Sequence, residues 1–157
     1  MYQYILEEGR DPLFYFKTKY GLKYFVSFRR MNFDGDFFEN LYSVDFGETN
    51  NQKFFRDPNV ELTITAIIND YLLKNPHLIL HYVCDNVDFK QDFRKELFDK
   101  WYRKTQKDVF SKVNFQYVIP GESVNYHLGF IFKNEYYEFQ EVVEKVNLHL
   151  EEFTNLK

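Results

Sequence analysis

The sequence predicts an α+β or α/β fold with a mixed β-sheet of about six strands, in the order βββ–α–β–α–ββ–α. The run Leu78 to Cys84 is short and almost wholly apolar and lies between turn signals, which is typical of a strand buried on both faces. Segments of period-two alternation stand before and after it, and two segments of helical periodicity flank it directly. With 157 residues, 45% of them hydrophobic, the chain is expected to form a single globular domain, 1–157.

The N-terminal part is predicted to be a three-stranded meander. Phe14 to Lys17 and Leu22 to Arg29 form two strands joined around Tyr20-Gly21, and the second alternates apolar and polar residues. A third strand is predicted from Asn40 to Phe46.

Two helices are predicted on either side of the buried strand. Asp57 caps the first and Pro58 suits its first position, and Asn75-Pro76 ends it. Asp88 is placed as the cap of the second helix. The inner residues of the first helix are expected to be Val60, Ile64, Ile67, Ile68 and Tyr71, and those of the second Phe89, Phe93, Leu97 and Trp101.

The C-terminal part is predicted to be a hairpin followed by a helix. Strands Val109 to Ile119 and Val124 to Lys133 meet at a Pro120-Gly121 turn, and Asn134 is expected to cap the last helix. Two interpretations stay open for that helix: it packs on the sheet, or it forms a homodimer. Its apolar residues have heptad-like spacing and are Tyr136, Phe139, Val143, Val146, Leu150 and Phe153.

The composition of the chain predicts where the protein is located and which kinds of partner it does not bind. The formal charge is −4, so binding of double-stranded nucleic acid is not expected. Cys84 is the only cysteine and permits no intramolecular disulfide, which favours a cytoplasmic protein. The N-terminus has no secretory signal pattern and the sequence has no long apolar run, so no membrane association is predicted. Aromatic residues make up 21% of the chain, which predicts a core built from large rings.

Two resemblances add to this picture. The stretches FYFKTKYGLKYFVSFRRM, TITAIINDYLLKNPHLILHYVCDN and RKELFDKWY resemble a family of small bacterial proteins of unknown function over nearly the whole chain. That resemblance implies no activity, substrate or catalytic residue. In element order alone, the chain is similar to the core of the GCN5-related N-acetyltransferase fold.

The acetyltransferase resemblance implies a coenzyme A site that the residues do not support. In that fold an Arg/Gln-x-x-Gly-x-Gly/Ala turn presents backbone N–H groups to the pyrophosphate at the start of the first core helix. The matching stretch here, Lys53 to Val60, has no glycine, while Pro58 removes a donor and Asp57 adds a negative charge. Asn86 matches an asparagine of the family, but Phe93 stands where the family often has a tyrosine.

Other chemistry is also missing from the sequence. The six glycines are isolated, which excludes nucleotide-binding glycine loops, and the cysteine and histidine spacings match no metal site. His81 and Cys84 are three apart on a strand and face opposite sides, so a buried structural cysteine and a satisfied core histidine are predicted. No catalytic residue, metal or cofactor is predicted.

The best candidate ligand site follows the buried strand. Ligands in open α/β sheets bind beyond the carboxyl ends of strands. Asp85, Asn86, Asp88 and Arg94 lie there and are the candidates. The alternative is structural: Asn86 and Asp88 make the turn and the cap, and Asp85 pairs with Arg94.

Charge is segregated between two of the predicted helices. Residues 89–107 carry seven basic and three acidic side chains, whereas residues 135–152 carry six glutamates and one lysine. These faces either serve solubility or recognise partners of opposite charge. The candidate interaction surface consists of Lys90, Lys95, Lys100, Arg103, Lys104 and Lys107.

Two functional hypotheses follow. The first is a small non-catalytic interaction or accessory protein with a protein partner that the sequence does not identify. The alternative is a degenerate acetyltransferase-like enzyme or cofactor-binding protein. The missing motifs favour the first, and therefore a protein that is not an enzyme.

Overall fold

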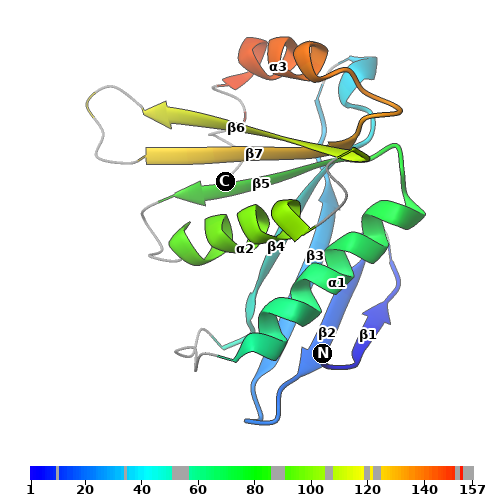
Figure 1. The fold of residues 1–157 in the computed structure, drawn as a ribbon, viewed down its shortest axis with the longest axis vertical. Coiled ribbons are helices and arrows are strands. Elements are labelled where there is room, and N and C mark those ends of the chain that lie inside the picture. Colours follow the sequence, from blue (N-terminus) through cyan, green and yellow to red (C-terminus); the bar gives the residue numbers. More distant parts are fainter. Residues whose placement is uncertain are drawn as a thin grey trace.

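A single twisted sheet runs through the structure, a computed structural model of the chain (Figure 1). It describes residues 1–9, 11–33, 35–50, 57–85, 91–104, 108–118, 121, 125–150 and 153, with only the backbone at 85, 91–93 and 125. The strand order is β1-β2-β3-β4-β5-β7-β6. The elements are β1 (Tyr4–Glu7), β2 (Leu13–Lys17), β3 (Lys23–Arg30), the 3₁₀ helix η1 (Asp36–Phe38), β4 (Leu41–Glu48), α1 (Pro58–Lys74), β5 (Ile79–Asp85), α2 (Gln91–Lys104), β6 (Phe110–Val118), β7 (Asn125–Lys133) and α3 (Phe139–Leu148).

The predicted fold class is confirmed, with seven strands where about six were expected. The additional strand is β1, which pairs antiparallel with β2 at the edge of the sheet. It has four residues, three of them exposed, so it lacks the alternation of buried and exposed positions by which a strand is found in a sequence. The predicted element order is otherwise observed.

The sheet contains one parallel pair, β4 and β5. Their register consists of three pairs, Leu41 with Ile79, Tyr42 with Leu80 and Ser43 with His81. Beyond the last pair β4 continues to Glu48 and β5 to Asp85, and the two strands diverge (Figure 1). We call this opening the fork. It separates an antiparallel half, β1 to β4, from a second half, β5, β7 and β6.

Side chains pack on both faces of β5, as its apolar sequence predicts. Leu80, Tyr82 and Cys84 join the core beneath α1 and α2. Ile79 joins a second core with η1, α3 and Phe153 on the opposite face. Figure 1 shows α1 and α2 on one side of β5 to β7 and α3 on the other. This arrangement also confirms that Cys84 is a buried residue, with 1% of its surface exposed.

The last helix begins later than predicted. Asn134 does not cap it; the N-cap is Glu138, and α3 starts at Phe139. Asn134 instead holds the turn after β7, where it accepts a hydrogen bond from the Ser111 hydroxyl and donates one to the Asp108 carbonyl.

The inner face of α3 agrees in part with the predicted seam. Val146 and Phe153 are buried, and Val143 and Leu150 pack against the second core. Val142 and Val146 are its buried residues, whereas Phe139 is 50% exposed. The helix thus packs its valines on its own sheet. A dimer through α3 stays a prediction, and it would have to use exposed residues such as Phe139 and Leu148.

The ring of Tyr82 lies over the neighbouring strand β7 at Gly129, the glycine of that strand. Tyr82 is the register partner of Gly129 on β7, and a Cβ at Gly129 would lie 1.9 Å from the Tyr82 Cζ. The other face of the Tyr82 ring stacks on Phe98 of α2, with the centroids 3.7 Å apart. The ring is therefore clamped between a strand backbone and a helix, and the contact requires glycine at position 129.

We predict that Gly129→Ala lowers the free energy of unfolding by about 1–3 kcal/mol, because the new methyl group must displace the Tyr82 ring from its stack. Urea denaturation followed by circular dichroism measures this. Gly9→Ala is the matched control, since an added Cβ there meets nothing within 4 Å. Equal stability of the two variants would show that the clamp does not exist.

Candidate functional site

The fork opens at the carboxyl end of β5, after which the ligand site was predicted, and an ion pair between described residues spans it. Arg94 of α2 lies with its Nη2 3.4 Å from Oδ1 of Asp45 on β4. The same carboxylate oxygen accepts a hydrogen bond from the Phe46 backbone N–H at 2.9 Å. Because α2 follows β5 in the chain, this ion pair links the two diverging halves of the sheet.

The candidate residues are only partly placed by the structure. Arg94 is brought to the fork and forms an ion pair there with Asp45, which the sequence did not single out. Its suggested pairing with Asp85 stays a prediction, because the side chain of Asp85 lies outside the described part of the structure. Asn86 and Asp88 lie outside the described residues, and of Asp85 only the backbone is described. The ligand site at residues 85–88 therefore stays a prediction.

Aromatic rings fill the inside of the fork on the face beneath the helices. Phe46 from β4 and Tyr82 from β5 both contact Phe98 of α2, with ring centroids 5.8 and 3.7 Å from it. All three are at most 4% exposed. The divergence of the strands therefore creates a packed wedge on this face.

His81 lies at the point of the fork and is fully enclosed. Its Nδ1 lies 2.9 Å from the Gly129 carbonyl oxygen, so Nδ1 carries the proton and donates it. Its ring stacks on Phe130 and meets Phe153 edge-on. Nε2 has no hydrogen-bond partner within the described part of the chain. The prediction of a satisfied core histidine is thus met at one ring nitrogen.

Burial lowers the pKa of His81 to about 4, and the hydrogen bond to Gly129 opposes this only in part. The ring is neutral at physiological pH, and its burial keeps it from reaching a substrate. Nε2 of His81 is therefore enclosed in the core, where no substrate reaches it.

We predict that His81 makes stability depend on pH between about 6.5 and 4. The unfolded chain binds a proton there and the native protein does not, so stability is complete above pH 6.5 and falls by up to about 3 kcal/mol as the pH approaches 4. Urea denaturation of His81→Leu and of His77→Gln, a control at an exposed histidine, measures it. An unchanged pH slope in His81→Leu between pH 7 and 5 would contradict the assignment.

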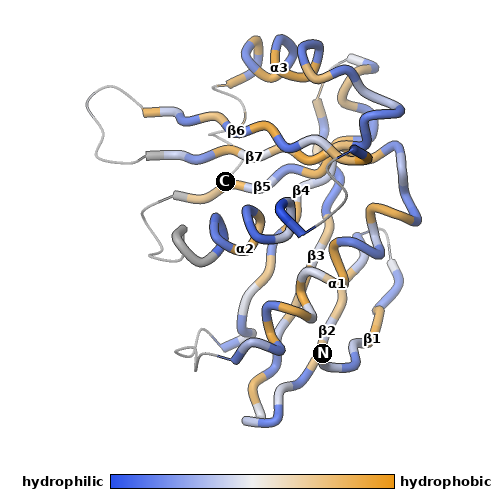
Figure 2. The backbone as a smooth tube through the Cα atoms, viewed as in Figure 1, coloured by the Kyte–Doolittle hydropathy of each residue, from blue (hydrophilic) through white to orange (hydrophobic). Residues whose placement is uncertain are grey.

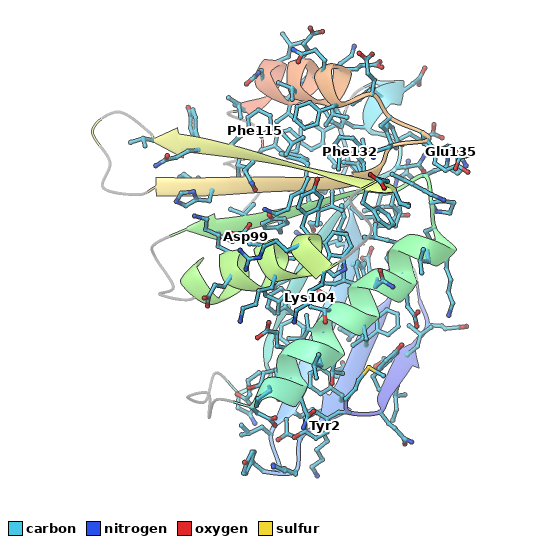
Figure 3. All side chains as sticks on the ribbon, in the orientation of Figure 1. Tyr2, Asp99, Lys104, Phe115, Phe132 and Glu135 are labelled. Carbon is cyan, nitrogen blue, oxygen red and sulfur yellow. The ribbon has the colours of Figure 1, made fainter. Side chains whose placement is uncertain are left out.

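A partly buried polar network lies between α2 and β6. The Lys112 side chain is 4% exposed and forms an ion pair with Asp99, which Figure 3 labels on α2. Its Nζ also lies 3.2 Å from Oδ1 of Asn114, which accepts a hydrogen bond from the Tyr82 hydroxyl. Burial raises the pKa of Tyr82, so the hydroxyl stays protonated. The network thus supplies partners for its two buried members, the Lys112 ammonium and the Tyr82 hydroxyl.

The start of α1 is closed by the chain's own residues. Pro58 has no N–H group, the Asn59 N–H donates to the Asp57 carboxylate at 3.0 Å, and the Val60 N–H donates to the Asp57 carbonyl. Tyr2, labelled beside this end in Figure 3, donates its hydroxyl hydrogen to the other Asp57 oxygen. The predicted Asp57 cap and Pro58 start are confirmed. The N–H groups with which a helix start binds phosphate are here absent or engaged.

The basic face of α2 is exposed where it is described. Lys95, Arg103 and Lys104 are exposed, and Lys100 is half-buried with its Nζ 3.5 Å from Oε1 of Glu61 on α1. Lys90 and Lys107 lie outside the described residues. The interrupting Asp99 is turned inward to Lys112, which leaves this face more basic than the sequence count suggests.

A groove of about 690 Å³ lies between α1 and α2 and was not predicted. The sequence carried a signal for it, because α1 has apolar residues outside its predicted inner stripe. Figure 2 shows this difference, with several hydrophobic stretches along α1 and a mostly hydrophilic α2. The groove is lined by Met1, Glu61, Leu62, Thr65, Ala66, Asn69, Leu73, Lys100, Trp101, Lys104, Val109 and Phe110.

Fold and site together define an α+β protein with a forked mixed sheet, whose first core helix begins without free backbone donors. The chain belongs to the family of unknown function DUF6169, which matches residues 56–148 and so spans α1 to α3. Comparison with curated proteins gave no match.

A solved structure, that of a proposed phosphinothricin N-acetyltransferase, is similar in outline. It has 10% sequence identity and a TM-score of 0.48, over 81% of this chain and 73% of that chain. At this level the activity of that protein does not transfer. In the part of the chain that the structure describes, no helix is long and apolar enough to cross a membrane.

Proposed function

We propose that the protein is a small non-catalytic interaction or accessory protein that binds an acidic partner protein through the basic face of α2. The observation that carries the proposal is the closed start of α1. Asp57, Pro58 and Tyr2 leave no backbone donor at the first three positions, where the acetyltransferase resemblance would put a coenzyme pyrophosphate.

Two further observations support the same conclusion. The rings of Phe46, Tyr82 and Phe98 pack the fork beneath the helices. The imidazole of His81 and the thiol of Cys84 are each 1% exposed, so neither can act on a substrate without a rearrangement of the core. On the helix side of the sheet, the cations of α2 and the groove between α1 and α2 are exposed instead.

The alternative is a degenerate acetyltransferase-like enzyme or cofactor-binding protein. The element order and the fork between β4 and β5 favour it. It requires a coenzyme contact that does not use the start of α1.

We predict that acetyl-coenzyme A produces no saturable heat in isothermal titration, because the Asp57 carboxylate repels phosphate and occupies the donors that would bind it. An acetyltransferase that carries the glycine turn serves as the positive control. Micromolar affinity that disappears when residues 57–60 are substituted would establish the alternative.

We also predict that the basic face does not bind double-stranded DNA appreciably at physiological salt. The net charge of −4 opposes it, and Arg94 and Lys100 are already paired with Asp45 and Glu61. Gel-shift titrations with double- and single-stranded DNA test this on the wild type.

Two double variants, in which lysine or arginine is replaced by glutamate, show whether any DNA binding uses the basic face of α2. Lys95→Glu/Arg103→Glu alters α2, and Lys17→Glu/Lys19→Glu makes the same change at exposed residues of another surface. Sub-micromolar, salt-sensitive binding that only the first pair abolishes would make a nucleic acid the partner in place of a protein.

A further inference from the structure

The groove between α1 and α2 has an apolar wall that the packing of the protein does not need. Leu62, Ala66, Asn69 and Leu73 follow one another at intervals of 4, 3 and 4 residues and so share one face of α1. The buried residues of α1, among them Ile64, lie on another face. Leu62 and Leu73 are 48% and 56% exposed. Along the helix axis they are about 16 Å apart, which gives the wall its length.

The opposite wall and the floor are aromatic and fixed in place. Trp101 and Phe110 are 3% and 2% exposed and pack edge-to-face, with centroids 5.7 Å apart. On the α1 side, the Thr65 hydroxyl donates to the carbonyls of Glu61 and Leu62, so its one donor hydrogen is used within the helix. The inside of the groove therefore offers mainly apolar contacts.

Cations stand on one side of this apolar surface. Lys100 and Lys104 lie one helical turn apart on α2 and flank Trp101. Lys100 is held by Glu61, whereas Lys104 is exposed and is labelled between α2 and α1 in Figure 3. A ligand that fits both features has an apolar chain and one negative charge.

We propose that the groove binds a medium-chain aliphatic carboxylate, with its alkyl chain along Leu62, Ala66 and Leu73 and its carboxylate at Lys104. The volume of about 690 Å³ lies within the range of small-ligand sites. Burial of the chain supplies most of the binding energy, and the charge-assisted contact with Lys104 sets the direction of the ligand. The inference concerns the groove alone and stands whether or not the basic face binds a protein.

The single tryptophan of the chain makes the test direct. Trp101 lines the groove, so its fluorescence reports what enters. Decanoate is the probe, and decanol and decyltrimethylammonium carry the same chain with a neutral and a positive head. Decanoate should give a saturable change in emission at the lowest concentration of the three. Equal or tighter binding of decanol or of the cation would overturn the assignment of the head group to Lys104, and no saturable change with decanoate would overturn the site.

Four variants locate the ligand. Lys104→Glu should weaken decanoate about tenfold, the size expected for one charge-assisted contact, and should leave decanol unchanged. Leu73→Asp should weaken both. Lys95→Glu repeats the charge change on α2 outside the groove, and Leu148→Gln replaces a leucine of α3 that is 75% exposed.

Both control variants should bind like the wild type. All four positions are exposed, so circular dichroism should show each variant folded. Decanoate binding that survives Lys104→Glu and Leu73→Asp, or that falls equally in the controls, would place the ligand elsewhere and refute the proposal.

Discussion

The contact between Tyr82 and Gly129 is the constraint on which the arrangement around the fork depends. The strands β4 and β5 separate after three residue pairs, so hydrogen bonds between them cannot hold the two halves of the sheet beyond Ser43 and His81. The ring of Tyr82 takes over this role because glycine on β7 lets it lie flat against the backbone and stack on Phe98. Phe98 in turn contacts Phe46 on the other arm of the fork. One missing side chain thus permits a chain of rings that joins β7, β5, α2 and β4.

This way of closing the fork has a consequence for function. An opening between two strands exposes backbone groups and is a natural place for a ligand, but here apolar rings occupy its helix-side face and the Arg94–Asp45 ion pair spans it. The start of α1 is closed in a similar manner by Asp57, Pro58 and Tyr2. Both the helix-side face of the fork and the start of α1 are therefore occupied by side chains of the protein itself. The groove and the exposed cations lie instead on the outer surfaces of α1 and α2.

The sequence predicted those parts of the fold that depend on local periodicity. The alternation in β3, the cap at Asp57 and the apolar run of β5 each encode their own structure, and the element order followed from them. It could not predict β1, which is short and mostly exposed and owes its structure to pairing with β2. The α3 seam was predicted only in part, because Val142 and Val143 are equally apolar, and only the position of the sheet decides that Val142 is the more deeply buried of the two. The Arg94–Asp45 pair was not predicted for a related reason, since Asp45 is distant in sequence and meets Arg94 only through the fold.

The two charged helices end up on opposite sides of the sheet, and their surroundings differ. The acidic helix α3 buries Val142 and Val146 against the sheet, so its charged residues lie beside apolar side chains that are already packed. The basic helix α2 also buries its apolar residues, but beside it α1 keeps Leu62 and Leu73 exposed. Burying the exposed half of each of these two leucines would be worth about 1.5–3 kcal/mol in total, and the fold leaves that free energy unused. Substitution at these positions should therefore disturb binding far more than stability, whereas substitution in the fork should do the reverse. The rings that stabilise the fork and the partly exposed leucines of α1 are therefore separate parts of the structure.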